Sequence, residues 1–169
     1  IEQLAAANED GDALAAVAER RLETARQLDA PAKRLRDLAA RLGQIRYRKL
    51  NDLAGAAGAF IEAFEHMPSD LDLYRVAEHT LARHPVPRLS IRLYTAYLHH
   101  TSPGKEQQIT VGLRLAAARE QAGKLSEAAR GLEGLHALDP SNAEVRSARA
   151  RVLRKAGQWP ALIALHQTE

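Results

Sequence analysis

The sequence predicts an all-α chain built from antiparallel helix-turn-helix hairpins, and three observations support this fold class. Alanine, leucine and arginine dominate the 169 residues, and these side chains lose little conformational freedom in a helix. Prolines at positions 31, 68, 103 and 140 recur at spacings of 37, 35 and 37 residues, each between two helical patterns. Within those patterns apolar residues recur every three to four positions, as on one face of a helix.

The first hairpin is expected over residues 1–30. The segment Asp10-Gly11-Asp12 is a turn signal. It predicts a short helix near 1–8 and a longer one near 12–28. Pro31 would then separate this hairpin from the next, since proline disfavours helix in the residue before it.

The second and third hairpins are expected over 31–67 and 68–102. In the second, Leu35, Leu38, Leu42 and Ile45 form one apolar stripe along a helix near 32–49. Asn51-Asp52 precedes its partner near 53–66. The third hairpin has helices near 70–83 and 87–100, separated by the segment 85–87 with its two prolines.

The last two hairpins are expected over 103–139 and 140–169. Their helices lie near 104–122, 125–137, 141–156 and 159–168. Gly123 and Gly157 stand where a glycine commonly ends a helix, and Ser141 is a candidate N-cap. The prediction is therefore ten helices in one continuous domain over 1–169, which we expect to be a segment of a longer chain.

These hairpins resemble the tetratricopeptide repeat, a helical hairpin of about 34 residues that ends near a proline. The resemblance covers nearly the whole chain and is weakest over 70–103. One matching set is Leu115-Ala116, Gly123, Ala128, Leu132, Leu135 and Pro140. Another is Leu42-Gly43, Ala56, Phe60, Ala63 and Pro68, with one extra residue between Gly43 and Ala56.

The resemblance implies a right-handed α-solenoid in which the first helix of each hairpin lines a concave groove. It also implies a protein-interaction scaffold, because this family serves many unrelated partners. Some members hold a peptide's terminal carboxylate with Lys and Asn side chains. The corresponding positions here are Ala40, Gln44, Leu113 and Ala117, which argues against that clamp.

Small residues in the helices are expected to permit close packing between backbones. Ala56, Ala63, Ala116 and Ala128 fit this interpretation, and Gly55 and Gly58 extend it. The single tryptophan, Trp159, is expected to pack at the corner between the last two helices.

Chemistry that would mark an enzyme is sparse. The chain has no cysteine, and it lacks a phosphate-binding loop, a nucleophile elbow and the HExxH spacing of zinc proteases. Glu62 and His66 lie one helical turn apart, which an ordinary surface contact explains as well as a metal or proton-transfer pair. We therefore expect no enzyme activity, no cofactor and no metal site.

Charge is unevenly distributed, and it suggests where a partner binds. The segment 32–49 has a net charge of +6 and the segment 141–156 a net charge of +4. Arginine forks in a groove would suit an acidic peptide, although the arginines could equally form solvated faces over the core. The predicted partner-binding residues are Arg41, Gln44, Tyr47, Arg48, Arg83, Arg151, Arg154 and Lys155.

The leading hypothesis is therefore a scaffold that binds another protein or a peptide, with an acidic segment as one option. A nucleic-acid-binding repeat is less favoured, because the more neutral segments 70–83 and 104–122 interrupt the basic ones. A structural spacer or self-assembling segment of a larger protein stays open. No segment predicts membrane insertion. The composition suggests a bacterial source; a cytoplasmic location is favoured, and a periplasmic or envelope-associated one stays open.

Overall fold

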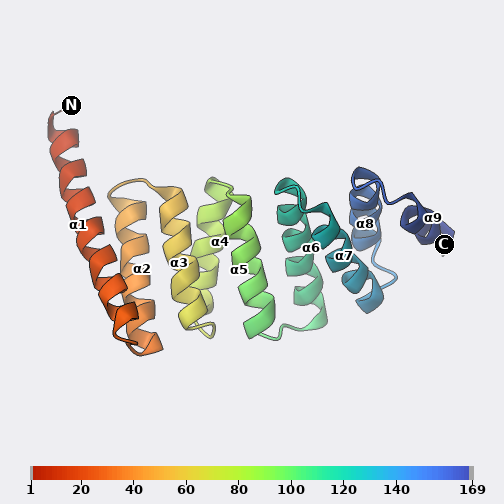
Figure 1. Cartoon of the computed structure of the whole chain (residues 1–169), viewed down its shortest axis with the longest axis horizontal. Helices are drawn as coiled ribbons and strands as arrows, with labels where there is room; N and C mark the ends of the chain where they lie inside the picture. Colours follow the sequence, from red (N-terminus) through yellow and green to blue (C-terminus); the bar gives the residue numbers. More distant parts are fainter. Residues whose placement is uncertain (1, 168–169) are drawn as a thin grey trace. The chain divides into compact units, whose positions relative to one another are not determined.

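The computed structural model describes the backbone of residues 2–167 and the side chains of residues 10–165. Over this part of the chain, nine helices follow one another with short connections and no strand (Figure 1). They are α1 (Glu2–Gln27), α2 (Ala32–Arg48), α3 (Leu53–His66), α4 (Leu71–Arg83), α5 (Pro87–His100), α6 (Lys105–Gln121), α7 (Leu125–Leu138), α8 (Ala143–Lys155) and α9 (Trp159–Gln167).

The first predicted hairpin is instead a single helix, so the expected break at Asp10-Gly11-Asp12 is wrong. Gly11 is buried inside α1 rather than in a turn. A Cβ at this position would lie 2.7 Å from the Cδ2 atom of Leu50. Gly11 therefore permits a close approach between α1 and Leu50, and this packing offsets the ~1 kcal/mol that a glycine costs within a helix.

The chain divides into two compact units, Ile1–Tyr97 and Leu98–Glu169. In the first unit α1, α2, α3 and α4 lie side by side, each against the next in the sequence (Figure 1). The buried stripe of α1 faces α2 and α3, and the hydrophobic cluster there consists of Ala15, Ala18, Leu22, Ala39, Leu42, Ala59 and Ala63. Small side chains at these positions let the helices approach closely.

Aromatic side chains continue the core of the first unit toward α5. The ring of Tyr74 lies 5.8 Å from that of Phe64 and 4.4 Å from that of Tyr97, measured between centroids. These separations suit tilted aromatic packing. Thr80 is also fully buried, and its hydroxyl donates to the Val76 carbonyl at 2.7 Å, so its one polar group is satisfied.

The second unit packs α6 to α9 around its own core. The hydrophobic cluster there consists of Ile109, Ala116, Ala128, Ala129, Leu132, Leu135, Val145, Ala148, Val152, Leu153, Leu162 and Leu165. In addition to its neighbour α7, α6 contacts α8 directly. This arrangement places α6 and α8 next to each other, as the first helices of successive hairpins should be.

Several predicted helix ends are confirmed, and two caps were missed. Gly123 and Gly157 have φ angles of +75° and +67° just after α6 and α8, the left-handed conformation that favours glycine. The cap of α8 is Asn142 rather than Ser141, since its side chain accepts from the Val145 amide at 3.0 Å. Asp52 caps α3 in the same way, on the Gly55 amide.

The close-packing interpretation holds for the alanines and fails at one glycine. The four alanines named for it are all buried. Around Gly58, by contrast, no atom lies within 4 Å of an added Cβ. The expectation for Trp159 is also wrong, because 56% of this residue is exposed. Trp159 is the first residue of α9, and the described side chains around the first turn of this helix do not cover it.

No helix in the described part of the chain combines the length and apolar character needed to cross a bilayer.

Candidate partner-binding grooves

The first candidate site is a hollow between α2 and α4, here called the α2–α4 groove. Its volume is about 550 Å³. Three predicted binding residues of α2 line it, namely Gln44, Tyr47 and Arg48. Across the groove α4 presents Val76 and His79, both exposed. A mixed apolar and polar lining of this kind suits a peptide segment.

Two predicted residues contact each other at this groove. The Arg83 guanidinium donates to the Tyr47 hydroxyl at 2.5 Å. Its central carbon also lies 5.6 Å from the centroid of the same ring, a cation–π distance. Arg83 and Tyr47 therefore join the C-terminal parts of α2 and α4, and the contact fixes the Tyr47 ring at the groove.

Arg41 lies beside the α2–α4 groove. It lines a shallower hollow along α2, together with Gln44 and Arg48, of about 530 Å³. Both arginines are exposed. Neither has an ion pair among the described side chains, so the structure places two unneutralised guanidinium groups on one face of α2.

The carboxylates near this face are already matched by other arginines. Arg36 lies 2.8 Å from Asp37 and 3.5 Å from Asp70. Asp72 is paired with Arg75 at 2.8 Å. The acidic side chains at the groove thus leave the charges of Arg41 and Arg48 uncompensated, and the residual charge of the α2 face is positive.

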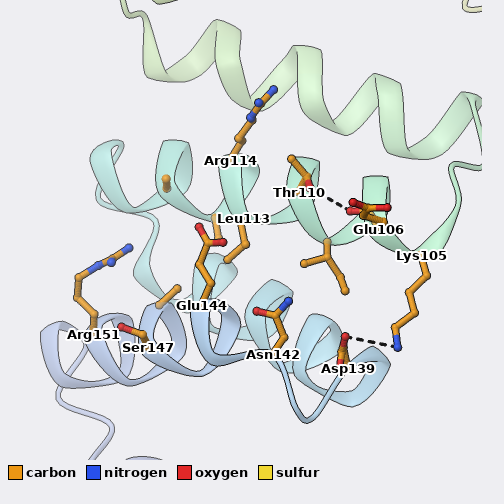
Figure 2. A pocket seen from close by; sticks show the side chains of 14 residues that line it. Lys105, Glu106, Thr110, Leu113, Arg114, Asp139, Asn142, Glu144, Ser147 and Arg151 are labelled. Atoms are coloured by element: carbon orange, nitrogen blue, oxygen red, sulfur yellow. Dashed lines mark hydrogen bonds and ion pairs between the residues drawn. The ribbon is translucent and has the colours of Figure 1, made fainter.

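The second candidate site is a hollow of about 880 Å³ between α6 and α8, here called the α6–α8 groove (Figure 2). Leu113 lies at its centre, with Thr110 on α6 and Ser147 on α8. Among its cations, Lys105 lies 3.4 Å from Asp139, Arg151 binds a carboxylate described below, and Arg114 also lines the groove. Glu106 and Glu144 line the groove without an ion pair in the described part of the chain.

Glu120 changes the electrostatic interpretation of α8. Both Arg151 and Lys155 bind its carboxylate, at 3.1 and 2.5 Å. The Lys155 hydrogen bond, followed by that of Arg151, lowers the pKa of Glu120 despite an opposing effect of burial. Two of the three predicted α8 cations therefore share one carboxylate within the chain, which offsets half of their combined charge. The third, Arg154, is exposed and does not line the groove.

The two grooves thus differ in residual charge. The α2 face is basic, as the sequence indicates. The lining of the α6–α8 groove is not basic, because its three basic side chains, Lys105, Arg114 and Arg151, are matched in number by the carboxylates of Glu106, Asp139 and Glu144. Both glutamates lie in the first turn of their helices, where a negative charge complements the helix dipole. The net charge of segment 141–156 could not reveal this, since Glu120 lies 31 residues before Arg151 in the sequence and the pairing depends on the fold.

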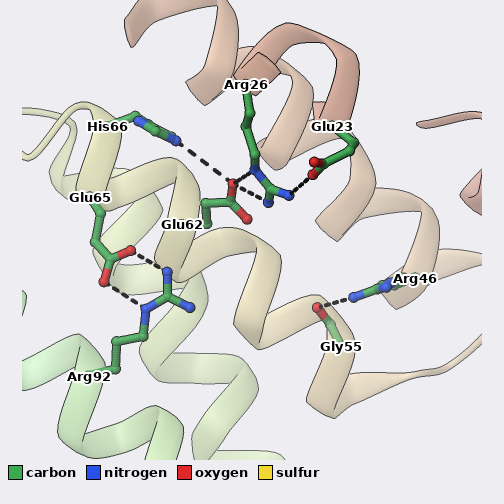
Figure 3. A network of polar contacts seen from close by, with 8 residues as sticks. All are labelled: Glu23, Arg26, Arg46, Gly55, Glu62, Glu65, His66 and Arg92. Atoms are coloured by element: carbon green, nitrogen blue, oxygen red, sulfur yellow. Dashed lines mark hydrogen bonds and ion pairs between the residues drawn. The ribbon is translucent and has the colours of Figure 1, made fainter. Parts of the chain in front are cut away.

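Polar contacts on other surfaces of the first unit are structural (Figure 3). Arg26 of α1 binds Glu62 of α3, donating from Nε at 3.0 Å and from Nη2 at 2.5 Å. Arg92 and Glu65 form a two-pronged pair between α5 and α3. His66 lies 3.8 Å from the same Glu62 carboxylate, so the Glu62–His66 spacing reflects a surface contact. Within the described residues no three His, Asp or Glu side chains gather into a metal-binding group.

No protein family matches the sequence, and no curated protein is similar to it. One similar solved structure is a mutant of MamA, with 16% sequence identity and a TM-score of 0.52. The match covers 98% of this chain and 94% of the MamA chain, and MamA contains tetratricopeptide repeats. The chain therefore has a tetratricopeptide-like fold, with nine sequential antiparallel helices over its described part.

Proposed function

We propose that the chain is a protein-interaction scaffold and that the α2–α4 groove, with the adjoining face of α2, binds an acidic peptide segment. The observation that carries the proposal is the pair of exposed, uncompensated guanidinium groups of Arg41 and Arg48 beside a groove with apolar elements.

Each group in the groove would have a separate part in binding. The guanidinium group of an arginine can donate two parallel hydrogen bonds to one carboxylate. Gln44 offers both a donor and an acceptor to a peptide backbone. Val76 is 43% exposed, so a partner that covered it would remove apolar surface from water and thereby stabilise the complex. Tyr47, held by Arg83, offers a rigid aromatic surface.

Residues on α8 have a smaller part in this proposal. Arg151 and Lys155 would have to exchange Glu120 for a partner's carboxylate, which gains little net free energy. Arg154 is unpaired in the described part of the chain and lies outside the α6–α8 groove. Partner binding by these three residues stays a prediction.

The test uses the whole chain and labelled synthetic peptides. One peptide of about 12 residues alternates Asp and Glu with apolar residues, and contains prolines so that it stays extended. Its control carries Lys in place of every acidic residue. We expect the acidic peptide to bind at least about tenfold more tightly, with an affinity that falls as salt is raised. Fluorescence anisotropy measures both.

The Arg41→Glu/Arg48→Glu double variant should lower affinity for the acidic peptide by at least about tenfold. The matched control is Arg88→Glu/Arg130→Glu, which also reverses two exposed arginines and should leave affinity unchanged. Equal binding by both double variants would remove the α2 face as the site. Preference for a single-stranded oligonucleotide over the acidic peptide would favour a nucleic-acid-binding repeat instead.

A further inference from the structure

The outer side of α1 carries apolar side chains that the described part of the chain leaves uncovered. Leu14, Val17 and Leu28 are 48, 52 and 74% exposed. Single exposed apolar residues are common on proteins, but a row of them marks an interaction surface. These three do form a row, because they lie on one side of a continuous helix and its last turn.

The spacing along α1 suits a helical partner. Leu14, Val17 and Leu28 occupy three of the positions 14, 17, 21, 24 and 28, which are separated alternately by three and four residues, the spacing of the seam along which two helices pack. Arg21 and Thr24 occupy the other two positions. The Leu28 amide donates to the Thr24 carbonyl at 3.1 Å, so the helical path reaches Leu28. The row is roughly 21 Å long, at 1.5 Å per residue. A separate stripe of α1, with Ala15, Ala18 and Leu22, is already used in the core.

A hollow accompanies this row. It has a volume of about 850 Å³ and lies between α1 and the first half of α2. Val17 and Leu28 line it from α1, and Leu38 lines it from α2. Apolar side chains of both α1 and α2 would contact a row of side chains on a docked helix from two sides, as when the ridges of one helix pack into the groove of another.

The charged groups of the hollow are arginines. Arg20 and Arg21 line it from α1 and Arg34 from α2, and all three are exposed. None has an ion pair among residues 10–165. Asp29 is the one acidic residue in the lining. A partner that covers the apolar row must therefore place negative charge near these guanidinium groups to avoid leaving them unmatched.

We propose that this outer α1 face, defined by Leu14, Val17, Leu28, Arg20, Arg21 and Arg34, binds an amphipathic helix of another protein with acidic residues along its apolar stripe. It is a second interaction surface, distinct from the α2–α4 groove. A helix is favoured over a lipid surface because Val17, Leu28 and Leu38 line a concave hollow between two helices, whereas a bilayer needs a face that protrudes.

The probe is a labelled peptide of about three heptads, with Leu at both seam positions and Glu at the flanking ones. Its control has Lys in place of Glu. The whole chain should bind the Glu peptide at least about tenfold more tightly than the Lys peptide. Amide exchange should slow in residues 12–28 when the Glu peptide is added. No binding of the Glu peptide, or equal affinity for both, would overturn the proposal.

Two variants separate the apolar and charged contributions. Val17→Ser/Leu28→Ser and Arg20→Glu/Arg34→Glu should each weaken binding of the Glu peptide at least about tenfold. Because all four side chains are exposed, circular dichroism should show an intact fold. The matched controls are Ile163→Ser, at an exposed apolar residue of α9, and Arg88→Glu. Retained binding in both α1 variants would overturn the proposal.

Testing the variants of each site with the peptide of the other site distinguishes the outer α1 face from the α2–α4 groove. Arg41→Glu/Arg48→Glu should leave the helical Glu peptide bound, and the α1 variants should leave the extended acidic peptide bound. Two further results would assign the outer α1 face to another occupant and so overturn the proposal. One is dimerisation in sedimentation experiments that Val17→Ser/Leu28→Ser abolishes. The other is binding to phosphatidylserine vesicles, lost in the same variant, without binding of the Glu peptide.

Discussion

Two glycines within helices have opposite surroundings, although the sequence presents them alike. A Cβ on Gly43 would lie 2.7 Å from the Phe60 ring, whereas one on Gly58 would meet no atom within 4 Å. Of these two positions, only Gly43 is closely packed against a neighbouring helix. The positions of the neighbouring helices decide how closely a glycine is packed. The residue type alone could therefore not predict the difference.

We expect Gly58→Ala to raise the free energy of unfolding by about 0.5 to 1 kcal/mol, because alanine restricts the unfolded chain and favours helix. Gly43→Ala should lower it by about 1 to 3 kcal/mol, since the buried Phe60 ring must shift. Urea unfolding followed by circular dichroism measures both changes. A change of the same sign in both variants would contradict the assigned surroundings.

Glu120 shows how one carboxylate links stability to pH. Its pKa is lowered in the folded chain, chiefly by the Lys155 hydrogen bond and then by Arg151. The folded state therefore favours the charged form. That contribution to stability is complete above the ordinary carboxyl pKa of about 4.3 and is lost as the pH falls through the lowered pKa of the folded chain.

Glu120→Gln should accordingly lower the free energy of unfolding by about 1 to 2 kcal/mol at neutral pH. It should also reduce the further loss of stability between about pH 5 and about pH 3. Part of the acid sensitivity should persist, because Ser141 lowers the pKa of Asp139 and Lys124 lowers that of Glu127. Thermal unfolding across this pH range, with Glu106→Gln as control, tests the assignment. A pH dependence identical to that of the unaltered chain would exclude it.

At the scale of elements, the positions of α2 to α9 follow from signals in the sequence. Proline or a proline-containing segment precedes α2, α4, α5, α6 and α8, and Gly123 and Gly157 follow α6 and α8. Such residues act through local backbone geometry, so they can be interpreted without knowledge of the fold. Gly11 was misinterpreted because its role depends on Leu50, which lies far away in the sequence.

The continuity of α1 can be tested with a proline. In a turn, Asp12→Pro would be tolerated, whereas within a continuous helix it removes a hydrogen bond and clashes with the preceding turn, at a cost of about 3 kcal/mol. We expect the variant to lose helical ellipticity and the protection of amides near residue 12. Asp29→Pro is not a suitable control, because Asp29 has a φ of +49° that proline cannot adopt. Asp12→Ala, which keeps the helix, serves instead. Equal ellipticity in Asp12→Pro and Asp12→Ala would instead indicate a turn at residue 12, as in the predicted hairpin.

At the scale of the molecule, the sequence predicted the repeat architecture better than the binding surface. Periodicity and proline spacing report on helices one after another, and they sufficed for the fold class. Net charge per segment does not report on pairing between segments. Net charge per segment correctly indicated the basic face of α2, where Arg41 and Arg48 stay unpaired. It overestimated the free positive charge of α8, whose Arg151 and Lys155 pair with Glu120 of α6.

The order in which the helices pack also has a kinetic consequence. Within each unit the most extensive contacts join helices that are adjacent in the sequence, so little of the chain must be closed into a loop before a contact can form. Chains dominated by such local contacts fold quickly. From α1 to α4, and again from α6 to α9, each helix has its docking surface as soon as the preceding one has formed, so each unit is suited to fold progressively while it is being synthesised.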